Sequence, residues 1–208
     1  MQETAILTYD ASDMVLAIHS DASYLSEKKS RSRVGGHFFM STNDEYPPNN
    51  GGVHVITQII KAVMASAAEA EIGAIFINAK EAVPLRKTLL EMGHPQPRTP
   101  IQTDNLAANA VVNNNVPPRR LKSMDMNFHW LRDRAAQNQF RIYWRPGRSN
   151  LGDYYSKHHP PAHHKDMRPQ FLTPVRHLDD LRRRINRARV SQELAQAIIH
   201  STFATRVC

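Results

Sequence analysis

Residues 16–26 read LAIHSDASYLS, and this stretch decides the fold that the sequence predicts. The apolar run over residues 14–18 has the aliphatic and β-branched character of a buried strand, so we expect a strand over residues 14–20. The run ends in polar residues, among them Asp21. One Asp after a strand is commonly a turn residue. It points to a functional site only if other carboxylates come to the same place.

The rest of the chain predicts four more strands and several helices. Strands are expected over residues 33–41, 53–60, 99–105 and 139–147. Helices are expected over residues 66–93, 106–114 and 123–138, and a short one within residues 150–159. Ser66 and Glu69 form a capping box before the long helix, and Gly93 is its expected stop. Pro84 is expected to kink or split that helix.

The order of these elements predicts the fold class. Three successive strands with short links indicate an antiparallel meander, and the alternation of helices and strands after it indicates parallel neighbours. We therefore expect an α/β fold with a mixed five-stranded sheet flanked by helices.

Composition limits the function classes. The 208 residues are 41% hydrophobic, enough for one domain with a core. Lys and Arg number 27 against 19 Asp and Glu, and the net charge of +8 favours polyanionic partners. The single Cys, Cys208, supports neither a disulfide framework nor a thiolate metal site. No apolar run approaches the ~20 residues that span a bilayer, and there is no signal peptide, so we expect no membrane partner and no secretion.

Four acids, Asp21 among them, are expected to lie close together in the fold. Asp21 and Asp104 follow strands expected to be parallel neighbours, Asp153 begins the last short helix, and Glu71 lies in the first turns of the long helix. Carboxylates gathered at one sheet edge need a cation, and oxygen ligands suit Mg²⁺ or Mn²⁺. A pair of such ions is a standard device for phosphodiester cleavage. The alternative is structural: Asp104 could belong to a helix cap and Asp153 could be a first-turn acid.

Five motifs in order, over residues 12–170, resemble the ribonuclease H domain of copia-type LTR retrotransposon polyproteins. They read HSDASY, SAAEAEIGAI, TDNLAA, RLKSMDMNFHWLRDR and NLGDYYSKHH. The resemblance implies a ribonuclease-H-like fold and a two-metal-ion endonuclease that cleaves the RNA strand of RNA·DNA hybrids, with Mg²⁺ or Mn²⁺ and no small-molecule cofactor. It also implies the reverse transcriptase part of the parent polyprotein as a partner, and a location in the cytoplasm, in virus-like particles there, or in the nucleus.

The resemblance assigns the site residue by residue. Asp21, Glu71, Asp104 and Asp153 would be the catalytic, metal-binding acids. We expect Asp21 to be the ligand shared between the two ions, because it lies centrally on the first strand. Glu69 competes with Glu71, because helical periodicity does not separate them. We choose Glu71 because AEIGAI aligns with the family motif, and Glu69 then keeps its capping role.

Nucleic-acid contacts are expected around these acids. The residues expected to make them are Ser23, Asn105, Arg119, Arg120, Lys122 and Arg148. The loop WRPGRSNLGD carries Arg148 and no His, whereas cellular ribonucleases H carry a His there. One alternative is therefore a catalytically degenerate binding module of the same fold. Another is a transposase or integrase core, which the Glu on the long helix argues against.

Three regions are expected along the chain. Residues 1–12 would be a remnant of a preceding segment, residues 13–160 the ribonuclease-H-like domain, and residues 161–208 a basic extension that ends in a helix. The stretch KHHPPAHHKDMRP, residues 157–169, is expected to be a loop. Its histidines could bind Zn²⁺, but paired His in a loop lack a rigidly placed further ligand, so we expect a charged extension.

Overall fold

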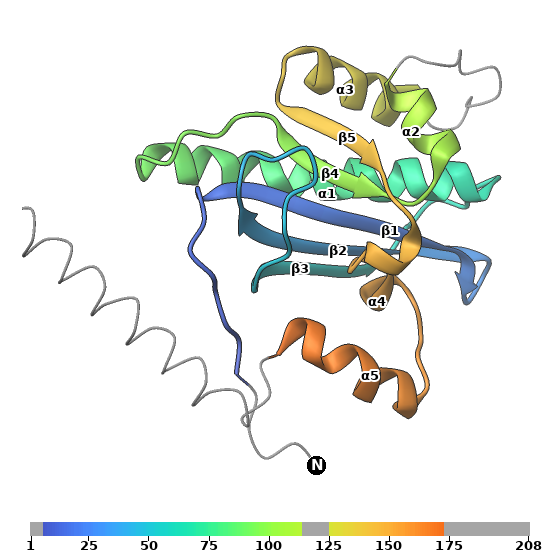
Figure 1. The fold of residues 1–208 in the computed structure, drawn as a ribbon. Coiled ribbons are helices and arrows are strands. Elements are labelled where there is room, and N and C mark those ends of the chain that lie inside the picture. The colour runs from blue at the N-terminus through green and yellow to red at the C-terminus, as the bar shows by residue number, and fades with distance from the viewer. Residues whose placement is uncertain (1–5, 114–124, 173–208) are drawn as a thin grey trace, which may run out of the picture. The chain divides into compact units, whose positions relative to one another are not determined.

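A mixed sheet of five strands organises the structure, a computed structural model in which residues 6–113 and 125–172 are described (Figure 1). The strands are β1 (Val15–Glu27), β2 (Arg31–Ser41), β3 (Gly52–Ile59), β4 (Thr99–Thr103) and β5 (Phe140–Trp144). Their order is β3-β2-β1-β4-β5. The first three strands pair antiparallel, whereas β4 runs parallel to both β1 and β5. The predicted meander and its parallel continuation are confirmed.

Strand β1 is longer than predicted, and Asp21 lies inside it rather than after it. Small and polar residues over 19–23 read as the end of a strand. In the structure they continue the ladder with β2, in which Asp21 pairs with Gly35. The long hairpin partner supplies backbone hydrogen bonds that outweigh the weak strand preference of these residues.

Helix α1 (Ala67–Glu91) begins and ends as predicted but is not split. The Ser66 side chain caps it by accepting a hydrogen bond from the Glu69 backbone N–H. Gly93, at φ +89°, ends it. Pro84 lies within a continuous helix, because buried residues on both sides of it, including Ala79 and Leu89, hold the two halves against the core.

The remaining helices are α2 (Leu106–Val112), α3 (Asp125–Ala136), the 3₁₀ turn η1 (Gly147–Ser149), α4 (Asp153–Ser156) and α5 (Pro161–Phe171). The expectation of a loop over residues 157–169 is wrong for most of that stretch, because α5 begins at Pro161. Proline reads as a loop signal, yet at the first helical position its fixed φ favours a helix and its missing N–H costs nothing.

The two faces of the sheet have different partners. Ile18 of β1 belongs to the main core, together with Ile72 and Ile75 of α1. On the same face, the Asn78 side chain of α1 donates to the Ser20 hydroxyl at 2.9 Å. Side chains alternate along a strand, so Asp21 points to the opposite face. That face carries α4 (Figure 1).

The chain divides into two compact units, residues 9–167 and a unit of residues 1–8 with 168–208. The sheet and the site belong to the first unit. The predicted contacts Arg119, Arg120 and Lys122 and the predicted C-terminal helix lie outside the described residues. Among the described helices, none is long and apolar enough to cross a membrane.

Candidate active site

Three carboxylates converge where β1 and β4 separate. The last residue pair of these parallel strands joins His19 to Gln102, and Asp21 and Asp104 each lie two residues beyond it. Glu71 reaches the same point from the first turns of α1. One carboxylate oxygen from each of the three acids lies within 4.8 Å of the others. The end of strand pairing therefore creates the opening in which acids from three elements meet.

Burial makes this group of acids electrostatically costly. Asp21 and Glu71 are 1% and 5% exposed. Burial raises the pKa of Asp21 to about 6, and Lys157 and a hydrogen bond from Ser156 oppose the rise only in part. Burial also raises the pKa of Glu71 well above its usual value, and the charges of Asp21 and Asp104 add to that rise. A divalent cation would offset the repulsion among these groups.

The hydrogen bonds of α1 distinguish Glu71 from Glu69. Glu71 accepts from the backbone N–H of Ala22 at 3.1 Å and from the Thr103 hydroxyl at 3.3 Å, and these bonds hold its carboxylate between β1 and β4. Glu69 accepts from the backbone N–H of Ala65 at 2.8 Å, at the start of its own helix. Glu71 therefore lies in the acid group, while Glu69 takes part in capping.

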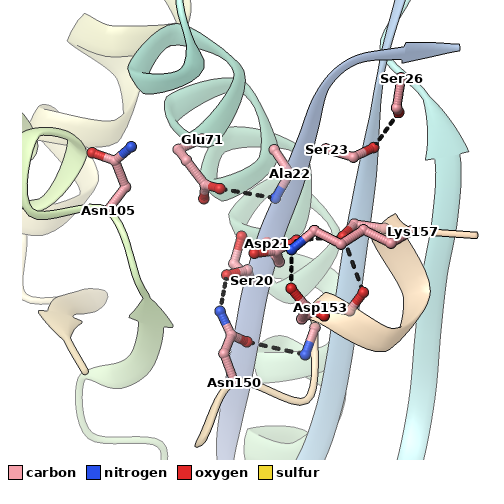
Figure 2. Close-up of polar contacts among 12 residues, drawn as sticks. Ser20, Asp21, Ala22, Ser23, Ser26, Glu71, Asn105, Asn150, Asp153 and Lys157 are labelled. Atoms are coloured by element: carbon pink, nitrogen blue, oxygen red, sulfur yellow. Dashed lines mark hydrogen bonds and ion pairs between the residues drawn. The ribbon is translucent and has the colours of Figure 1, made fainter. Parts of the chain in front are cut away.

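Asp153, the first residue of α4, lies beside this group but is not one of its three members. Its Oδ1 forms an ion pair with Lys157 Nζ, which also lies 3.8 Å from Oδ2 of Asp21 (Figure 2). The Ser156 hydroxyl donates to the same oxygen of Asp21. Burial lowers the pKa of Lys157, but its hydrogen bond to Asp153 and the surrounding acids raise it by more, so the net shift is upward. Asp21 thus connects the three-acid group to Asp153.

Lys157 and Ser156 were not singled out from the sequence. The spacing of Asp153 and Lys157 is a usable signal, because residues four apart can form an ion pair on a helix. The contact of Ser156 with Asp21 joins residues far apart in the chain, so no local sequence pattern predicts it.

The turn before α4 is held against β1. The Asn150 amide donates to the backbone carbonyl of Ser20 at 2.8 Å, and its oxygen accepts from the Gly152 N–H at 3.0 Å. The Leu151 N–H donates to Nδ1 of His19 at 3.1 Å. These bonds connect the start of α4 directly to the strand that carries Asp21.

The predicted nucleic-acid contacts have different surroundings. Ser23 is buried, and its hydroxyl lies 2.5 Å from that of Ser26. Asn105 follows Asp104 and caps α2 by accepting from the Ala108 N–H at 2.9 Å. Arg148 is exposed in η1. Of these three, Arg148 is the side chain most open to a bound duplex.

Within residues 6–113 and 125–172, the three acids are the only set of potential ligand side chains of this size close enough to share one ion. The histidines considered for Zn²⁺ are His158, His159, His163 and His164. Three of them pack around the ring of Tyr154, and the rings of His159 and His163 stack at 4.1 Å. They form no comparable ligand set.

Two buried histidines, His19 of β1 and His37 of β2, lie on the face of the sheet that carries α4. His19 and His37 are 5% and 2% exposed, and their ring centroids are 6.3 Å apart. Burial, with smaller contributions from the charges of His37 and Arg145, lowers the pKa of His19 to about 3. Burial lowers the pKa of His37 to about 4. Both rings therefore stay neutral in the folded protein at pH values that protonate them in the unfolded chain.

Replacing His37 with Gln is expected to reduce the acid sensitivity of the fold. His37 titrates near pH 6.5 when unfolded and near pH 4 when folded, so its contribution to stability is complete above pH 6.5 and declines as the pH falls toward 4. The slope is about 1.4 kcal/mol per pH unit. Urea unfolding of both proteins across this range measures the difference. The pKa values of Asp21 and Glu71 are raised, so these acids change stability with pH in the opposite direction. Both acids are present in the wild type and in His37→Gln, so their contribution cancels in the comparison. Equal slopes would show that folded His37 is protonated.

Comparison with known proteins connects this geometry to known sequences. No family model matches the chain. The retrovirus-related Pol polyprotein from transposon TNT 1-94 of Nicotiana tabacum is 24% identical to it over 151 residues. The match covers 73% of this chain but only 11% of the polyprotein. The chain thus resembles a small part of a retrotransposon polyprotein, as its motifs indicate.

Solved structures with a similar fold include ribonucleases H. A ribonuclease H1 isolated from compost by a metagenomic approach superposes with a TM-score of 0.51 at 12% identity, over 68% of this chain and 92% of that one. The N-terminal ribonuclease H domain of a Mycobacterium tuberculosis protein gives a TM-score of 0.49 at 14% identity, over 76% and 97%. The first of these superpositions, with the strand order β3-β2-β1-β4-β5, shows that the chain has the ribonuclease-H-like fold that the sequence predicts.

Proposed function

We propose that this chain is a divalent-metal-dependent endonuclease that cleaves the RNA strand of RNA·DNA hybrids, from the ribonuclease H region of a copia-type retrotransposon polyprotein. The observation that carries the proposal is the group of Asp21, Glu71 and Asp104 at the point where β1 and β4 separate. The ribonuclease-H-like fold and the similarity to a transposon Pol polyprotein support it.

The donor atoms of this group fit Mg²⁺ or Mn²⁺. All of them are carboxylate oxygens, the ligand type that these ions prefer. In the described part of the chain, neither Glu71 nor Asp104 forms an ion pair with a basic side chain. Within those residues, neither carboxylate is therefore directly paired with a basic side chain, and a bound cation would supply the missing positive charge.

The acids have distinct proposed roles. Asp21, Glu71 and Asp104 would hold one ion, and Asp21 with Asp153 would hold a second, so Asp21 would be the shared ligand. Such ions, when bound, supply an activated water and charge stabilisation for in-line phosphodiester cleavage. The two hydrogen bonds to Glu71 fix its carboxylate before any ligand arrives, which reduces the reorganisation needed at the site.

Basic side chains are proposed to hold the duplex. Arg148 is exposed near the turn that leads into α4, and we assign phosphate contacts to it and to Arg119, Arg120 and Lys122. Such contacts position a duplex without reading its sequence. Groove shape and 2′-hydroxyl contacts would select the hybrid, with Asn105 as a polar contact beside Asp104. The reverse transcriptase part of the polyprotein is the proposed partner, in the cytoplasm, virus-like particles or the nucleus.

A second candidate function is hybrid binding without cleavage. Two observations favour it: Lys157 pairs with Asp153 inside the site, and Arg148 lies in a loop where cellular ribonucleases H carry a His. A chain that had lost turnover could keep the fold and the phosphate contacts proposed for Arg148.

The test is cleavage of a hybrid with one labelled strand, with Mg²⁺, with Mn²⁺ and with chelator. We expect cuts in the RNA strand only, dependent on either metal. Matched RNA·RNA, DNA·DNA and single-stranded RNA substrates serve as controls. Hybrid binding without cleavage in either metal would move the function to the second candidate, and equal cutting of single-stranded RNA would contradict the proposed substrate.

A further inference from the structure

Lys157 lies where a second cation would be expected. Its ammonium pairs with Asp153 and lies 3.8 Å from Oδ2 of Asp21 (Figure 2). These are the two acids to which the proposed function assigns a second ion. The protein therefore already places one positive charge of its own between them.

The two candidate cation positions differ in whether a basic side chain already lies between their acids. The position formed by Asp21, Glu71 and Asp104 has a basic side chain only on its Asp21 side, because neither other acid forms an ion pair within the described residues. The position between Asp21 and Asp153 contains the Lys157 ammonium. At the first position a divalent ion meets no basic side chain paired with Glu71 or Asp104, whereas at the second it must compete with Lys157.

We propose that Lys157 acts as a built-in competitor for the second divalent ion, so that the free chain binds one ion readily and a second only when Lys157 moves away. This inference rests on the proposed function, because it concerns the same acids. A scissile phosphate is a natural alternative partner for the ammonium, so substrate binding would favour the exchange.

The structure allows Lys157 to move. Its side chain is 42% exposed, whereas that of Asp21 is 2% exposed. It directly follows the last residue of α4, and its backbone is extended. Helix α4 keeps other anchors, since the Ser156 hydroxyl donates to Asp21 and the Thr57 hydroxyl donates to the Tyr155 carbonyl at 2.9 Å. Releasing Lys157 therefore need not release the helix.

The test counts bound Mn²⁺ in the full chain without substrate, by calorimetric titration and by electron paramagnetic resonance of the free ion. The wild-type chain is expected to bind one ion, with a second much weaker. Lys157→Met should strengthen the second binding event roughly tenfold and leave the first nearly unchanged. Lys157→Gln serves as a second variant, should Lys157→Met fold poorly.

Lys87→Met is the matched control. Lys87 also pairs with an acid four residues away, Glu91, at 3.7 Å, but both side chains are largely exposed near the far end of α1. The Lys87→Met variant should leave both Mn²⁺ binding events unchanged. Two outcomes would overturn the inference and leave the proposed function standing. One is a single Mn²⁺ site of the same affinity in the wild type and in both Lys157 variants, and the other is two sites of equal affinity in the wild type. No Mn²⁺ binding above that of Asp104→Asn would overturn both.

Discussion

Replacing Asp21 with Asn is expected to abolish metal-dependent cleavage and, in the same protein, to raise stability in the absence of metal. Asp21 is the acid that connects the Glu71 and Asp104 group with Asp153, so its loss should reduce cleavage by roughly a thousandfold or more. Its near-complete burial raises its pKa from 3.8 to about 6, which means that the folded state disfavours the charged form. In the absence of a bound cation, ionised Asp21 therefore lowers the stability of the fold.

The size and pH dependence of the stability gain follow from that pKa. The shift from 3.8 to about 6 corresponds to about 3 kcal/mol at neutral pH, an upper bound, so we expect a gain of roughly 1–3 kcal/mol. The penalty for ionised Asp21 is complete above pH 6 and disappears as the pH falls toward 3.8. The advantage of Asn should therefore be largest above pH 6 and nearly absent near pH 4.

Thermal and urea unfolding in chelator, at neutral pH and near pH 4, measure this effect beside the hybrid cleavage assay. Asp166→Asn is the control, because Asp166 is exposed on α5. Added Mn²⁺ should stabilise the wild type and the control but not Asp21→Asn, since a ligand stabilises only the state that binds it. Undiminished cleavage by Asp21→Asn would contradict the assigned role. Loss of cleavage together with lower stability would indicate a structural role instead.

Local patterns predicted most of the fold and the approach of Asp21 and Asp104 to each other. The Ser66 cap and the Gly93 stop are set by residues next to one another, so the sequence alone locates α1. The positions of Asp21 and Asp104 follow from strand order, because neighbouring parallel strands bring their ends to one edge. Glu71 could be separated from Glu69 only by a motif resemblance, since both lie near the buried side of the helix.

Features that depend on distant partners were not predictable in this way. Strand β1 continues through Asp21 because β2 pairs with it, and no property of residues 19–23 alone favours that outcome. Lys157 enters the site because the turn before α4 is tied to β1 by bonds between residues about 130 positions apart in sequence. The sequence thus predicted that these acids lie close together, but it did not predict Lys157 and Ser156, the groups that contact Asp21.

Replacing Gly35 with Ala is expected to displace α4 and to reduce cleavage, although Gly35 itself is not one of the site's acids. Gly35 pairs with Asp21 across the hairpin and faces α4. A Cβ there would lie 2.6 Å from the Ser156 backbone nitrogen and closer still to the Gly152 carbonyl oxygen. Backbone atoms cannot rotate away as a side chain can, so the helix must shift. We expect a loss of roughly 1–3 kcal/mol in stability and a large loss of cleavage, because Asp153 moves with the helix.

Gly36→Ala is the control that separates these two effects. Gly36 is the next residue on the same strand, but a Cβ there would meet the Asn78 side chain of α1, on the opposite face of the sheet. Both variants should lower the free energy of unfolding measured in urea. Only Gly35→Ala should lower cleavage per folded molecule and weaken the second Mn²⁺ binding event, because only it moves the helix that carries Asp153. Equal activity of the two variants per folded molecule would show that the position of α4 does not control the site.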